Sequence, residues 1–562
     1  VFEDFDIKTA VFTALDEACD EGTILASNTS SLSVNALAEA TGRPDRFVGL
    51  HFFYHPAKNR LIEVIPAETT SKDTLERTVQ YCRTLGKVVI VCKDRPGFVV
   101  NRFFVPWLNE ACLLLEEGIA TAAQIDAISC KAFRIGLGPF GLMNLTGPPI
   151  ALHSTDYLAE QLNTSRYNGA QNLRDLVAEN AMWPIEDESE YTQDQYTTVS
   201  ERLLGVVFGV AAQIVEEDIC SMEDVDRGAK VGLRWARGPF EMMNRIGVAE
   251  AYRMAQSYQA IAGEAWTLPA FFKNQSDAST NWDFSYVDSS VEDGIATITI
   301  NRPEAMNALN EVVIAQLTEA VQAANSDSNV ATIVLDGAGK AFVAGADVKF
   351  FVDKIRSDDI PDIETFTENG HILLAALEDS TKTTIALTTG LALGGGLELA
   401  LACDYRIGTR RTQFRFPETS IGIYPALGGT QRPARIAGRE LGRWAVLAGN
   451  FMNAETANDL GLVTHLVDIN DVPNCIKDIH ASGKPDNKYP GKPMNENSPV
   501  VKFAKKFFSD GNMAALLAGS CPDGFDAEDK TVARQLKSLK FTAPIGLAMA
   551  CLLYTSDAAD DW

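Results

Sequence analysis

Histidine is scarce in this chain, at only 6 of 562 residues. Positive charge is also short: 49 Lys and Arg stand against 75 Asp and Glu, a formal net charge of −26. Such a surface repels phosphates, which argues against a general nucleic-acid binder. The ten cysteines include no C-x-x-C pair and lie mostly in apolar runs such as EACLLL and LALACD. This usage indicates reduced, buried thiols in a cytoplasmic protein, and it argues against disulfides and zinc sites, so we expect no metal.

Long apolar runs are missing as well. The uncharged stretch TTIALTTGLALGGGL is broken by glycines. It is also shorter than the roughly 20 residues of a membrane-spanning helix, so we expect no membrane span. Hydrophobic residues make up 46% of the chain and charged residues 22%, which is ordinary for a globular protein. The length suffices for roughly three or four domains with sizeable cores.

Neither end of the chain looks native. The sequence starts at Val1 in mid-pattern, without methionine, so any targeting segment would be invisible. It ends in LLYTSDAADDW, which continues no periodicity before it. We therefore expect a fragment truncated at both ends, in which residues 551–562 are a non-native tail.

An internal repeat organises the middle of the first half. The stretch beginning NRFFVPWLNE at Asn101 aligns without a gap with the stretch beginning ERLLGVVFGV at Glu201, at an offset of 100 residues. The aligned pairs include Glu116 with Glu216, Asp126 with Asp226, Gly147 with Gly247, and Gly-Pro-Phe at 138–140 with 238–240. Both copies show the apolar period of long helices, then a Gly-Pro turn and another helix, which predicts a duplicated all-α domain.

Two polar linkers are expected around the second copy. The acidic stretch EDESEYTQDQY (186–196) precedes it, and NQSDASTNWDFS (274–285) follows it. The pattern changes at about residue 285, because strands such as GIATITI and VATIVLDG then alternate with glycine-rich turns and helices. This alternation is typical of an α/β domain.

One of the few histidines stands near a carboxylate in GLHFFYHPAKNRLIEV (49–64). RFVGLHFF and RLIEVIPA are predicted strands that flank a turn, with His51 and Glu63 near their ends. A carboxylate that fixes the imidazole tautomer would suit a general base, although a purely structural histidine is the alternative. Two polar stretches favour the base: ASNTSSL (26–32) leaves a predicted strand, and PGFVVNR places Asn101 near the start of the first helical copy.

The stretches LASNTSSLS, GLHFF, LIEV and DRPGFVVNR resemble the 3-hydroxyacyl-CoA dehydrogenase family in order and spacing. The resemblance implies that His51 takes the proton from the substrate 3-hydroxyl while a hydride leaves for NAD. Glu63 would orient and polarise His51, and Ser30 and Asn101 would hold the substrate's oxygens.

The same resemblance implies a binding site for the nicotinamide side of NAD formed by Glu3, Lys8, Asn28 and Ser30. Glu3 and Lys8 would equally suit solvated helix positions. This chain departs from the family after HFF, where Tyr54-His55-Pro56 replaces the usual Asn-Pro.

The family's G-x-G-x-x-G phosphate loop would stand before Glu3, and this sequence does not contain it. On domain size we expect roughly 100 further residues before Val1. We also expect the 562 residues alone to lack dehydrogenase activity. Single-copy relatives dimerise through the helical domain, so the second copy, with Glu201 in place of Asn101, is expected to replace the partner structurally.

Glycine-rich turns mark a second constellation. KAFVAGADV follows the strand VATIVLDG, and GLALGGGLELALACD follows TIALTT. Two amides from separate glycine-rich loops can grip one carbonyl oxygen and stabilise the charge that builds there, although a glycine run alone could be only a turn. Glu398 lies just past the run and Glu418 follows in FRFPETSIG. Paired carboxylates suit acid/base work on water and on a carbon next to a carbonyl.

These motifs, with INRPEAMNAL, YPALGGTQR and GLVTHLV, resemble the enoyl-CoA hydratase/isomerase (crotonase) family over residues 286–470. The resemblance implies that the amides of Ala346 and Gly395 form the oxyanion hole for a coenzyme A thioester. Glu398 and Glu418 would activate the water added at C3 and handle the proton at C2. Two glutamates favour a hydratase, since the isomerases of this family commonly keep one.

The expected fold class is multidomain, part α/β and part all-α. It comprises a partial Rossmann NAD-binding domain (1–93), two helical dehydrogenase domains (94–190 and 191–282), and a crotonase-type ββα superhelix (283–550) through which the chain would form an oligomer.

The expected function is a bifunctional acyl-CoA enzyme that hydrates 2-enoyl-CoA and then oxidises 3-hydroxyacyl-CoA with NAD. Its domain order resembles fusions in archaea and some bacteria that serve fatty-acid β-oxidation or a crotonyl-CoA pathway. An enoyl-CoA isomerase fused to the dehydrogenase and a non-catalytic acyl-CoA-binding scaffold are the alternatives.

Overall fold

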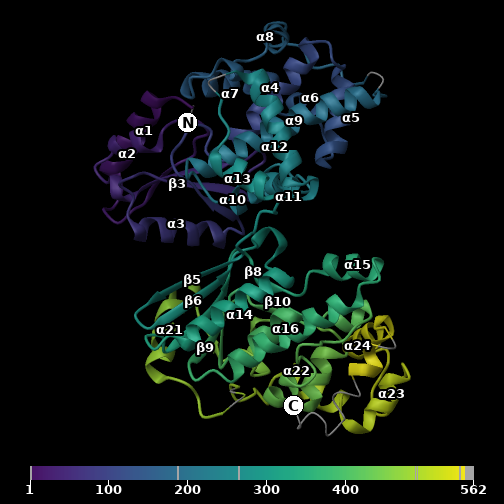
Figure 1. Cartoon of the computed structure of the whole chain (residues 1–562). Coiled ribbons are helices and arrows are strands. Elements are labelled where there is room, and N and C mark those ends of the chain that lie inside the picture. The colour runs from purple at the N-terminus through teal and green to yellow at the C-terminus, as the bar shows by residue number, and fades with distance from the viewer. Residues whose placement is uncertain are drawn as a thin grey trace. The chain divides into compact units, whose positions relative to one another are not determined.

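The computed structural model describes residues 3–186, 189–263, 266–487, 489, 491–543 and 546–550. The chain divides into two compact units, residues 1–284 and 285–562, each of which is considered by itself (Figure 1). The expected non-native tail, residues 551–562, lies outside the described residues.

The first unit contains a four-stranded sheet of order β1-β2-β3-β4. The β1–β2 and β3–β4 pairs are parallel and the β2–β3 pair is antiparallel. Both β2 and β3 are apolar and almost fully buried, as expected of central strands. The two strands predicted around His51 are therefore confirmed. The elements of this part are β1 (Leu25–Ser27), β2 (Phe47–Phe52), β3 (Leu61–Pro66), β4 (Val88–Val91), α1 (Phe5–Ala18), α2 (Val34–Glu39), η1 (Pro44–Arg46) and α3 (Lys72–Thr84).

The predicted helical repeat is present, and its elements recur at the offset of the sequence repeat. The first copy comprises α4 (Val100–Glu116), α5 (Ala122–Phe133), α6 (Pro139–Thr146), α7 (Pro148–Gln161), η2 (Ser165–Tyr167) and α8 (Gln171–Ala178). The second comprises α9 (Gln193–Glu216), α10 (Met222–Arg227), η3 (Gly228–Gly232), α11 (Pro239–Ile246), α12 (Val248–Ala262) and α13 (Ala270–Ala278). In both copies an aspartate, Asp126 or Asp226, accepts two backbone N–H groups at the start of the helix that follows the Gly-Pro turn.

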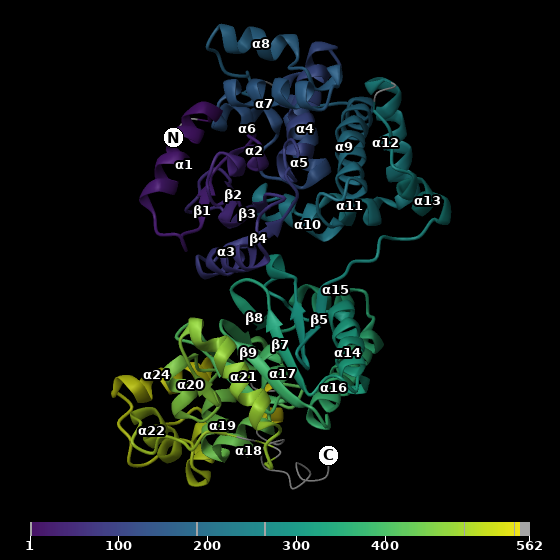
Figure 2. The same ribbon diagram turned by 90° about the vertical axis from the view of Figure 1, so that its left-hand side faces the viewer.

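The two copies pack against each other within one chain, as the replacement of a dimer partner would require. Helices α4 and α9 are in contact and run side by side (Figure 2). Trp235 of the second copy lies against Phe133 of the first, with ring centroids 4.8 Å apart. Buried Glu110 of α4 accepts hydrogen bonds from Arg166 and from Arg202 of α9. Glu201, which stands where the first copy has Asn101, forms an ion pair with Arg253 of its own copy.

The second copy departs from the first after α10, where a π-helical turn, η3, replaces the last turns of α5. Close packing gives the reason. A side chain at Gly228 would come within 2.7 Å of Val100, and one at Gly232 within 2.6 Å of Leu61. The turn therefore lets this segment lie directly on α4 and β3.

Both expected linkers are shorter than predicted. Helix α9 begins inside the first one, because Thr192 and Gln195 form a capping box. Helix α13 extends into the second, and Trp282 of that linker is buried against Phe240. Helix α9 is long and apolar enough to cross a membrane, but 78% of its apolar window is buried, as in a core helix.

The second unit is built on two sheets. Five strands of the six-stranded sheet, of order β14-β11-β9-β7-β6-β5, run parallel, and β5 pairs antiparallel with β6. The other sheet has the order β13-β12-β10-β8. The strands are β5 (Val287–Glu292), β6 (Ile295–Ile300), β7 (Thr332–Gly337), β8 (Ala341–Ala344), β9 (Thr383–Thr388), β10 (Leu391–Leu393), β11 (Tyr405–Gly408), β12 (Gln413–Arg415), β13 (Met452–Asn453) and β14 (His465–Leu466).

Helices connect successive strands of these sheets, as expected of parallel pairs. They include α14 (Glu311–Ser326), α15 (Val348–Arg356), α16 (Ile360–Glu378), α17 (Gly395–Leu401), α18 (Arg432–Ala437), α19 (Arg439–Val446) and α20 (Ala454–Asp459), and α21 (Val472–Ser482) follows β14. Three further helices follow α21 along the chain: α22 (Pro499–Phe507), α23 (Met513–Leu517) and α24 (Lys530–Phe541). Short 3-10 turns are η4 (Pro303–Ala305), η5 (Glu418–Ile421), η6 (Ile469–Asp471) and η7 (Asp510–Asn512).

Candidate active sites

His51 and Glu63 face each other across the β2–β3 pair. The strand register sets the two residues opposite one another, and His51 Nδ1 lies 2.5 Å from Glu63 Oε2. Glu63 Oε1 accepts the backbone N–H groups of Val99 at 3.2 Å and Val100 at 2.9 Å. Both side chains are buried. Because an ionised carboxylate only accepts, Nδ1 is the donor of this pair and Nε2 is left to take a proton.

Asn101 is positioned by the same backbone segment. Helix α4 begins at Val100, so the two amides that bind Glu63 immediately precede the half-buried Asn101. The imidazole of His51 lies between Phe53 and Phe98, with ring centroids 4.5 and 5.7 Å away. The histidine ring is therefore held against aromatic side chains on the side away from solvent.

Glu3, Lys8 and Asn28 form one polar cluster at the end of β1. The Lys8 ammonium donates to Glu3 Oε2 and to the Asn28 carbonyl oxygen, each at 2.6 Å. Glu3 Oε1 accepts from the Thr29 hydroxyl and the Ser30 backbone N–H. Lys8 is buried, so it is not a solvated helix residue. Although burial opposes it, hydrogen bonding, first from Lys8, lowers the pKa of Glu3 to about 2.

The side chains of Asn28 and Ser30 remain exposed beside this cluster. Asn28 Oδ1 accepts the Phe52 backbone N–H at 3.2 Å, which ties the end of β1 to the end of β2, one residue from His51. The departure at Tyr54-His55-Pro56 lies in the turn after β2, where Tyr54 is 69% exposed and its ring contacts that of His55. It takes no part in the His51–Glu63 pair.

The second unit brings two backbone donors together from separate loops. Ala346 forms a parallel bridge with Leu309, in which the Leu309 N–H binds the Gly345 oxygen and the Asp347 N–H binds the Leu309 oxygen. In such a bridge the N–H of Ala346 itself points to the other side. Gly395 is the first residue of α17, where backbone N–H groups have no partner within the helix. The loop and the helix N-terminus can thus donate to one oxygen.

Glu398 and Glu418 are both buried and lie beside the glycines at the start of α17, Gly395 and Gly394 respectively. Glu398 Oε1 accepts the N–H groups of Leu427 at 2.8 Å and Gly429 at 2.6 Å. Within the described part of the chain, Glu418 Oε2 has no hydrogen-bond partner. The absence of a side chain at Gly394 lets the Glu418 carboxylate lie against the backbone there, because a Cβ would stand 2.4 Å from Glu418 Oε1. The φ of Gly394, +50°, also favours glycine.

Burial sets the proton affinity of this pair. Desolvation raises the pKa of Glu398 to about 7, against the lowering effects of the Gly429 amide and Arg432. Desolvation and then the charge of Glu398 raise the pKa of Glu418 well above its usual range. One carboxylic acid can therefore persist beside one carboxylate near neutral pH.

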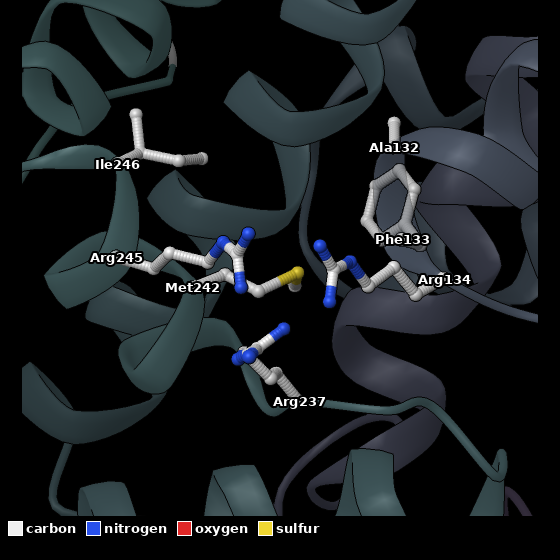
Figure 3. A pocket seen from close by; sticks show the side chains of 7 residues that line it. All are labelled: Ala132, Phe133, Arg134, Arg237, Met242, Arg245 and Ile246. Atoms are coloured by element: carbon white, nitrogen blue, oxygen red, sulfur yellow. The ribbon is translucent and has the colours of Figure 1, made fainter. Parts of the chain in front are cut away.

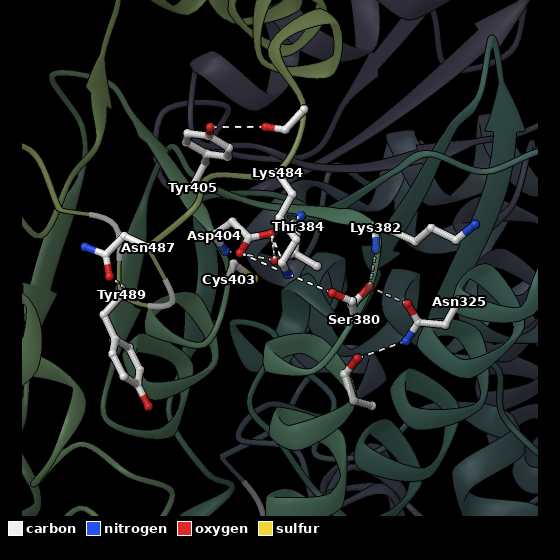
Figure 4. A network of polar contacts seen from close by, with 12 residues as sticks. Asn325, Ser380, Lys382, Thr384, Cys403, Asp404, Tyr405, Lys484, Asn487 and Tyr489 are labelled. Atoms are coloured by element: carbon white, nitrogen blue, oxygen red, sulfur yellow. Dashed lines mark hydrogen bonds and ion pairs between the residues drawn. The ribbon is translucent and has the colours of Figure 1, made fainter.

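A polar network holds the end of the segment that carries Glu398 (Figure 4). Asp404, which follows α17, accepts the Thr384 backbone N–H at 2.8 Å and the Thr384 hydroxyl at 3.0 Å. The Lys484 ammonium lies 3.2 Å from the same carboxylate. The C-terminal end of α17 is thereby tied to β9, which holds the helix that carries Glu398 against the sheet.

Four backbone amides that hold the glutamates were not singled out from the sequence. Val99 and Val100 lie in DRPGFVVNR, and Leu427 and Gly429 lie in YPALGGTQR, both of which had been noted as motifs. Main-chain donors carry no residue signature, so only the glycine run at 428–429 could have pointed to them.

Comparison with protein families finds matches for both units. Residues 1–95 match the 3-hydroxyacyl-CoA dehydrogenase NAD binding domain, and residues 97–189 and 199–278 match the C-terminal domain of that family. Residues 295–556 match enoyl-CoA hydratase/isomerase. The chain combines domains of these two families. Its dehydrogenase part precedes its hydratase/isomerase part.

Among curated proteins, the chain is 37% identical to a 3-hydroxybutyryl-CoA dehydrogenase of Clostridioides difficile, over 32% of this chain and 64% of that protein. It is 32% identical to a fatty acid oxidation complex subunit alpha of Shewanella amazonensis (strain ATCC BAA-1098 / SB2B), over 49% of this chain and 42% of that protein. An enoyl-CoA hydratase structure from Rhodobacter sphaeroides 2.4.1 aligns at 26% identity and a TM-score of 0.42, covering 48% and 77% of the two chains. The chain spans less than two thirds of the curated relatives it matches.

The residues at the end of β1 fit the NAD that the dehydrogenase family binds. Nucleotides bind outside the carboxyl ends of strands, where Asn28 and Ser30 expose an amide and a hydroxyl. Lys8 supplies a buried positive charge there, held by Glu3. This donor set suits the carboxamide and ribose groups of a nicotinamide nucleotide.

Proposed function

We propose that the protein is a bifunctional acyl-CoA enzyme, which hydrates 2-enoyl-CoA to 3-hydroxyacyl-CoA and oxidises that product to 3-oxoacyl-CoA with NAD. The observation that carries the proposal is the buried pair Glu398 and Glu418 beside the amides of Ala346 and Gly395. The 3-hydroxyacyl-CoA made at this site is the substrate class of the dehydrogenase family to which the first unit belongs. Cytoplasmic location and an oligomer formed through the second unit belong to the same proposal.

In the hydration step the thioester oxygen would accept the N–H groups of Ala346 and Gly395. The positive end of α17 adds to the stabilisation of the enolate charge. The ionised glutamate of the pair takes a proton from water as the oxygen attacks C3, and the protonated one delivers a proton to C2. The pair starts and ends with one proton, but on the other glutamate, so the proton has to return to the first acid before the next turnover.

In the oxidation step His51 would take the proton of the 3-hydroxyl at Nε2, while Glu63 stabilises the imidazolium through Nδ1. Asn101 and Ser30 would orient the substrate's oxygens by hydrogen bonds. Glu3, Lys8, Asn28 and Ser30 would hold the nicotinamide end of NAD, which when bound accepts the hydride from C3.

The isomerase alternative would move the double bond of a 3-enoyl-CoA with one glutamate only. Both glutamates are present here, buried, and close enough for the charge of Glu398 to raise the pKa of Glu418, which favours the hydratase. The scaffold alternative gives no reason to retain a buried carboxylate oxygen without a partner, at a cost of roughly 1–3 kcal/mol.

Two assays with the full chain test the hydratase. Hydration of crotonyl-CoA should be the faster reaction, and conversion of a 3-enoyl-CoA to the 2-enoyl-CoA should be slow. The reverse ranking would assign the isomerase, and absence of both reactions in the folded protein would leave the scaffold. For the dehydrogenase, the natural protein should oxidise 3-hydroxybutyryl-CoA with NAD, and His51→Gln should abolish this without unfolding the sheet. Unchanged oxidation by the variant would remove His51 from its role.

A further inference from the structure

Arginines occupy both exposed and buried positions in this protein. Arg134 and Arg245, which line a small cavity of about 70 Å³ in the first unit, are exposed (Figure 3). Arg432, the first residue of α18 in the second unit, is by contrast only 8% exposed. A buried charge is costly unless it is paired and hydrogen-bonded, so the partners of Arg432 indicate what this side chain does.

Arg432 is bound by a carboxylate and by a backbone loop of the second unit. Its Nε donates to Glu378 Oε1 at 2.8 Å, and its Nη1 donates to the Leu427 carbonyl oxygen at 2.6 Å. Its backbone N–H donates to the Gly428 oxygen at 2.9 Å. Gly428 leaves room for the guanidinium, because a Cβ at this position would collide with Arg432 Nη1. The arginine thus joins Glu378 to residues 427–428.

The same loop holds Glu398. The N–H groups of Leu427 and Gly429 bind Glu398 Oε1, whereas the carbonyl oxygens of Leu427 and Gly428 accept from Arg432. The loop therefore presents donors to the carboxylate and acceptors to the arginine. Burial raises the pKa of Glu398 to about 7, while the Gly429 amide and then the charge of Arg432 act in the opposite direction.

Glu378 gives Arg432 a fixed partner, because it is the last residue of a helix whose end is held in place. The Asn325 side chain donates to the Ala376 oxygen at 2.9 Å and accepts from the Ser380 hydroxyl at 2.5 Å (Figure 4). These bonds fix the end of α16 on both sides of Glu378. The Glu378 side chain is 14% exposed, so water screens its ion pair with Arg432 only weakly.

We propose that Arg432, oriented by Glu378, is a positioning residue of the hydratase, which holds residues 427–429 so that their amides fix Glu398 for proton transfer. Arginine suits this role because its planar fork binds a carboxylate and a carbonyl oxygen in fixed directions at the same time. Arg432 acts on the reaction through the loop and not by contact with the substrate. The inference rests on the proposed hydration and adds α16 and α18 to the elements that support that site.

The pH dependence of hydration distinguishes positioning from mere packing. The charged and titratable groups that act directly on Glu398 are Glu418 of η5 and Arg432 of α18. Next to these two lie Glu378 and His371 of α16, Cys403 after α17, and Arg415 of β12. Arg432→Gln removes a charge that favours ionised Glu398, so the pH at which kcat/KM for crotonyl-CoA is half-maximal should rise by roughly one unit. Glu378→Gln removes a negative charge and should lower this pH.

The value of kcat separates the geometry of Arg432 from its charge. Arg432→Lys keeps the charge but loses the fork, so it should lower kcat at least roughly tenfold and leave the half-maximal pH unchanged. Arg435→Gln is the matched control. Arg435 lies three residues further along α18, is exposed and donates to the Tyr489 hydroxyl, so its replacement should change neither value.

Hydrogen exchange measured by mass spectrometry gives a readout that needs no activity. Exchange of the amides of residues 424–431 should be faster in Arg432→Gln than in the wild type, and Arg435→Gln should leave it unchanged. The proposal is overturned if folded Arg432→Gln keeps the wild-type kcat and half-maximal pH, or if exchange in this segment does not change.

Glu378→Gln decides the question if Arg432→Gln does not fold. A half-maximal pH that stays the same or rises in Glu378→Gln then overturns the proposal, and a lowered one supports it. Absence of hydration by the folded wild type would refute the proposed function. Hydration by the wild type with unchanged variants would refute only the role of Arg432, so the two failures are distinguishable.

Discussion

Each unit of the protein buries a glutamate at its candidate active site, and the two glutamates are treated in opposite ways. Glu63 has both carboxylate oxygens occupied, by His51 and by the amides of Val99 and Val100. Glu418 is also buried, yet its Oε2 has no hydrogen-bond partner among the described residues and a second carboxylate, Glu398, lies nearby. Burial alone therefore does not determine what a glutamate does.

The difference follows from what stands around each carboxylate. A carboxylate that accepts several N–H groups is stabilised as an anion and serves to orient its neighbour. A buried carboxylate with one oxygen that no donor reaches, beside a like charge, retains its proton more strongly, as the raised pKa of Glu418 indicates. The first arrangement positions a base, and the second can transfer protons itself. Four predictions would break or sharpen this contrast.

The largest expected effect is on hydration. Glu398→Gln and Glu418→Gln should each lower the rate of crotonyl-CoA hydration by roughly 10²- to 10⁴-fold, because each removes one partner of the acid/base pair. Glu319→Gln, an exposed glutamate of α14, is the control and should retain full activity. Steady-state kinetics with protein shown to be folded by circular dichroism measures the effect. Equal rates for wild type and both variants would disprove the role of the pair.

The second effect is on the stability of the first unit. Glu63→Ala should lower the free energy of unfolding by about 3 kcal/mol, because it leaves two backbone N–H groups and the His51 ring without their buried acceptor. Glu63→Gln keeps one acceptor oxygen and should cost less. The exposed Glu68 provides the control, since Glu68→Ala should change stability by less than about 0.5 kcal/mol. If denaturant titration gives equal values for Glu63→Ala and Glu68→Ala, Glu63 does not hold this segment.

The sequence predicted those structural features that depend on the identity of side chains or on the periodicity of apolar residues. The alternation of GIATITI and the apolar runs around His51 predicted strands, and the repeat at an offset of 100 residues predicted two matching sets of helices. The His51–Glu63 pairing followed from two strands joined by a turn, and the register of β2 and β3 brings these side chains together.

The remaining features depend on the main chain and on contacts between distant segments. The capping box at Thr192 extended α9 into a stretch whose acidic composition had suggested a linker. The π-helical turn η3 depends on how closely Gly228 approaches Val100 across the two copies. The amides of Leu427 and Gly429, which hold Glu398, are donors that every residue has.

The third effect is a pH dependence of hydration. Since burial raises the pKa of Glu398 to about 7 and that of Glu418 well above its usual range, both carboxyl groups are protonated in acid and no base remains. The value of kcat/KM for crotonyl-CoA should therefore rise with pH up to about 7 and fall roughly tenfold per unit below it. A profile that stays flat between about pH 5 and pH 8 would show that neither glutamate titrates as the base.

The smallest effect concerns stability and distinguishes the two kinds of buried glutamate directly. The pKa of Glu418 is raised in the folded state, so its neutral form stabilises the fold fully below the ordinary value of about 4.5, and this contribution is lost as pH rises toward the raised pKa. Gln cannot titrate, and its presence also removes the like charge beside Glu398. The difference in thermal midpoint, Glu418→Gln minus wild type, should therefore increase by a few degrees between about pH 5 and about pH 8. Glu319→Gln, whose side chain is exposed, should show a constant difference over the same range. A pH-independent difference for Glu418→Gln would mean that this carboxyl group is ionised in the folded protein as readily as in the unfolded chain.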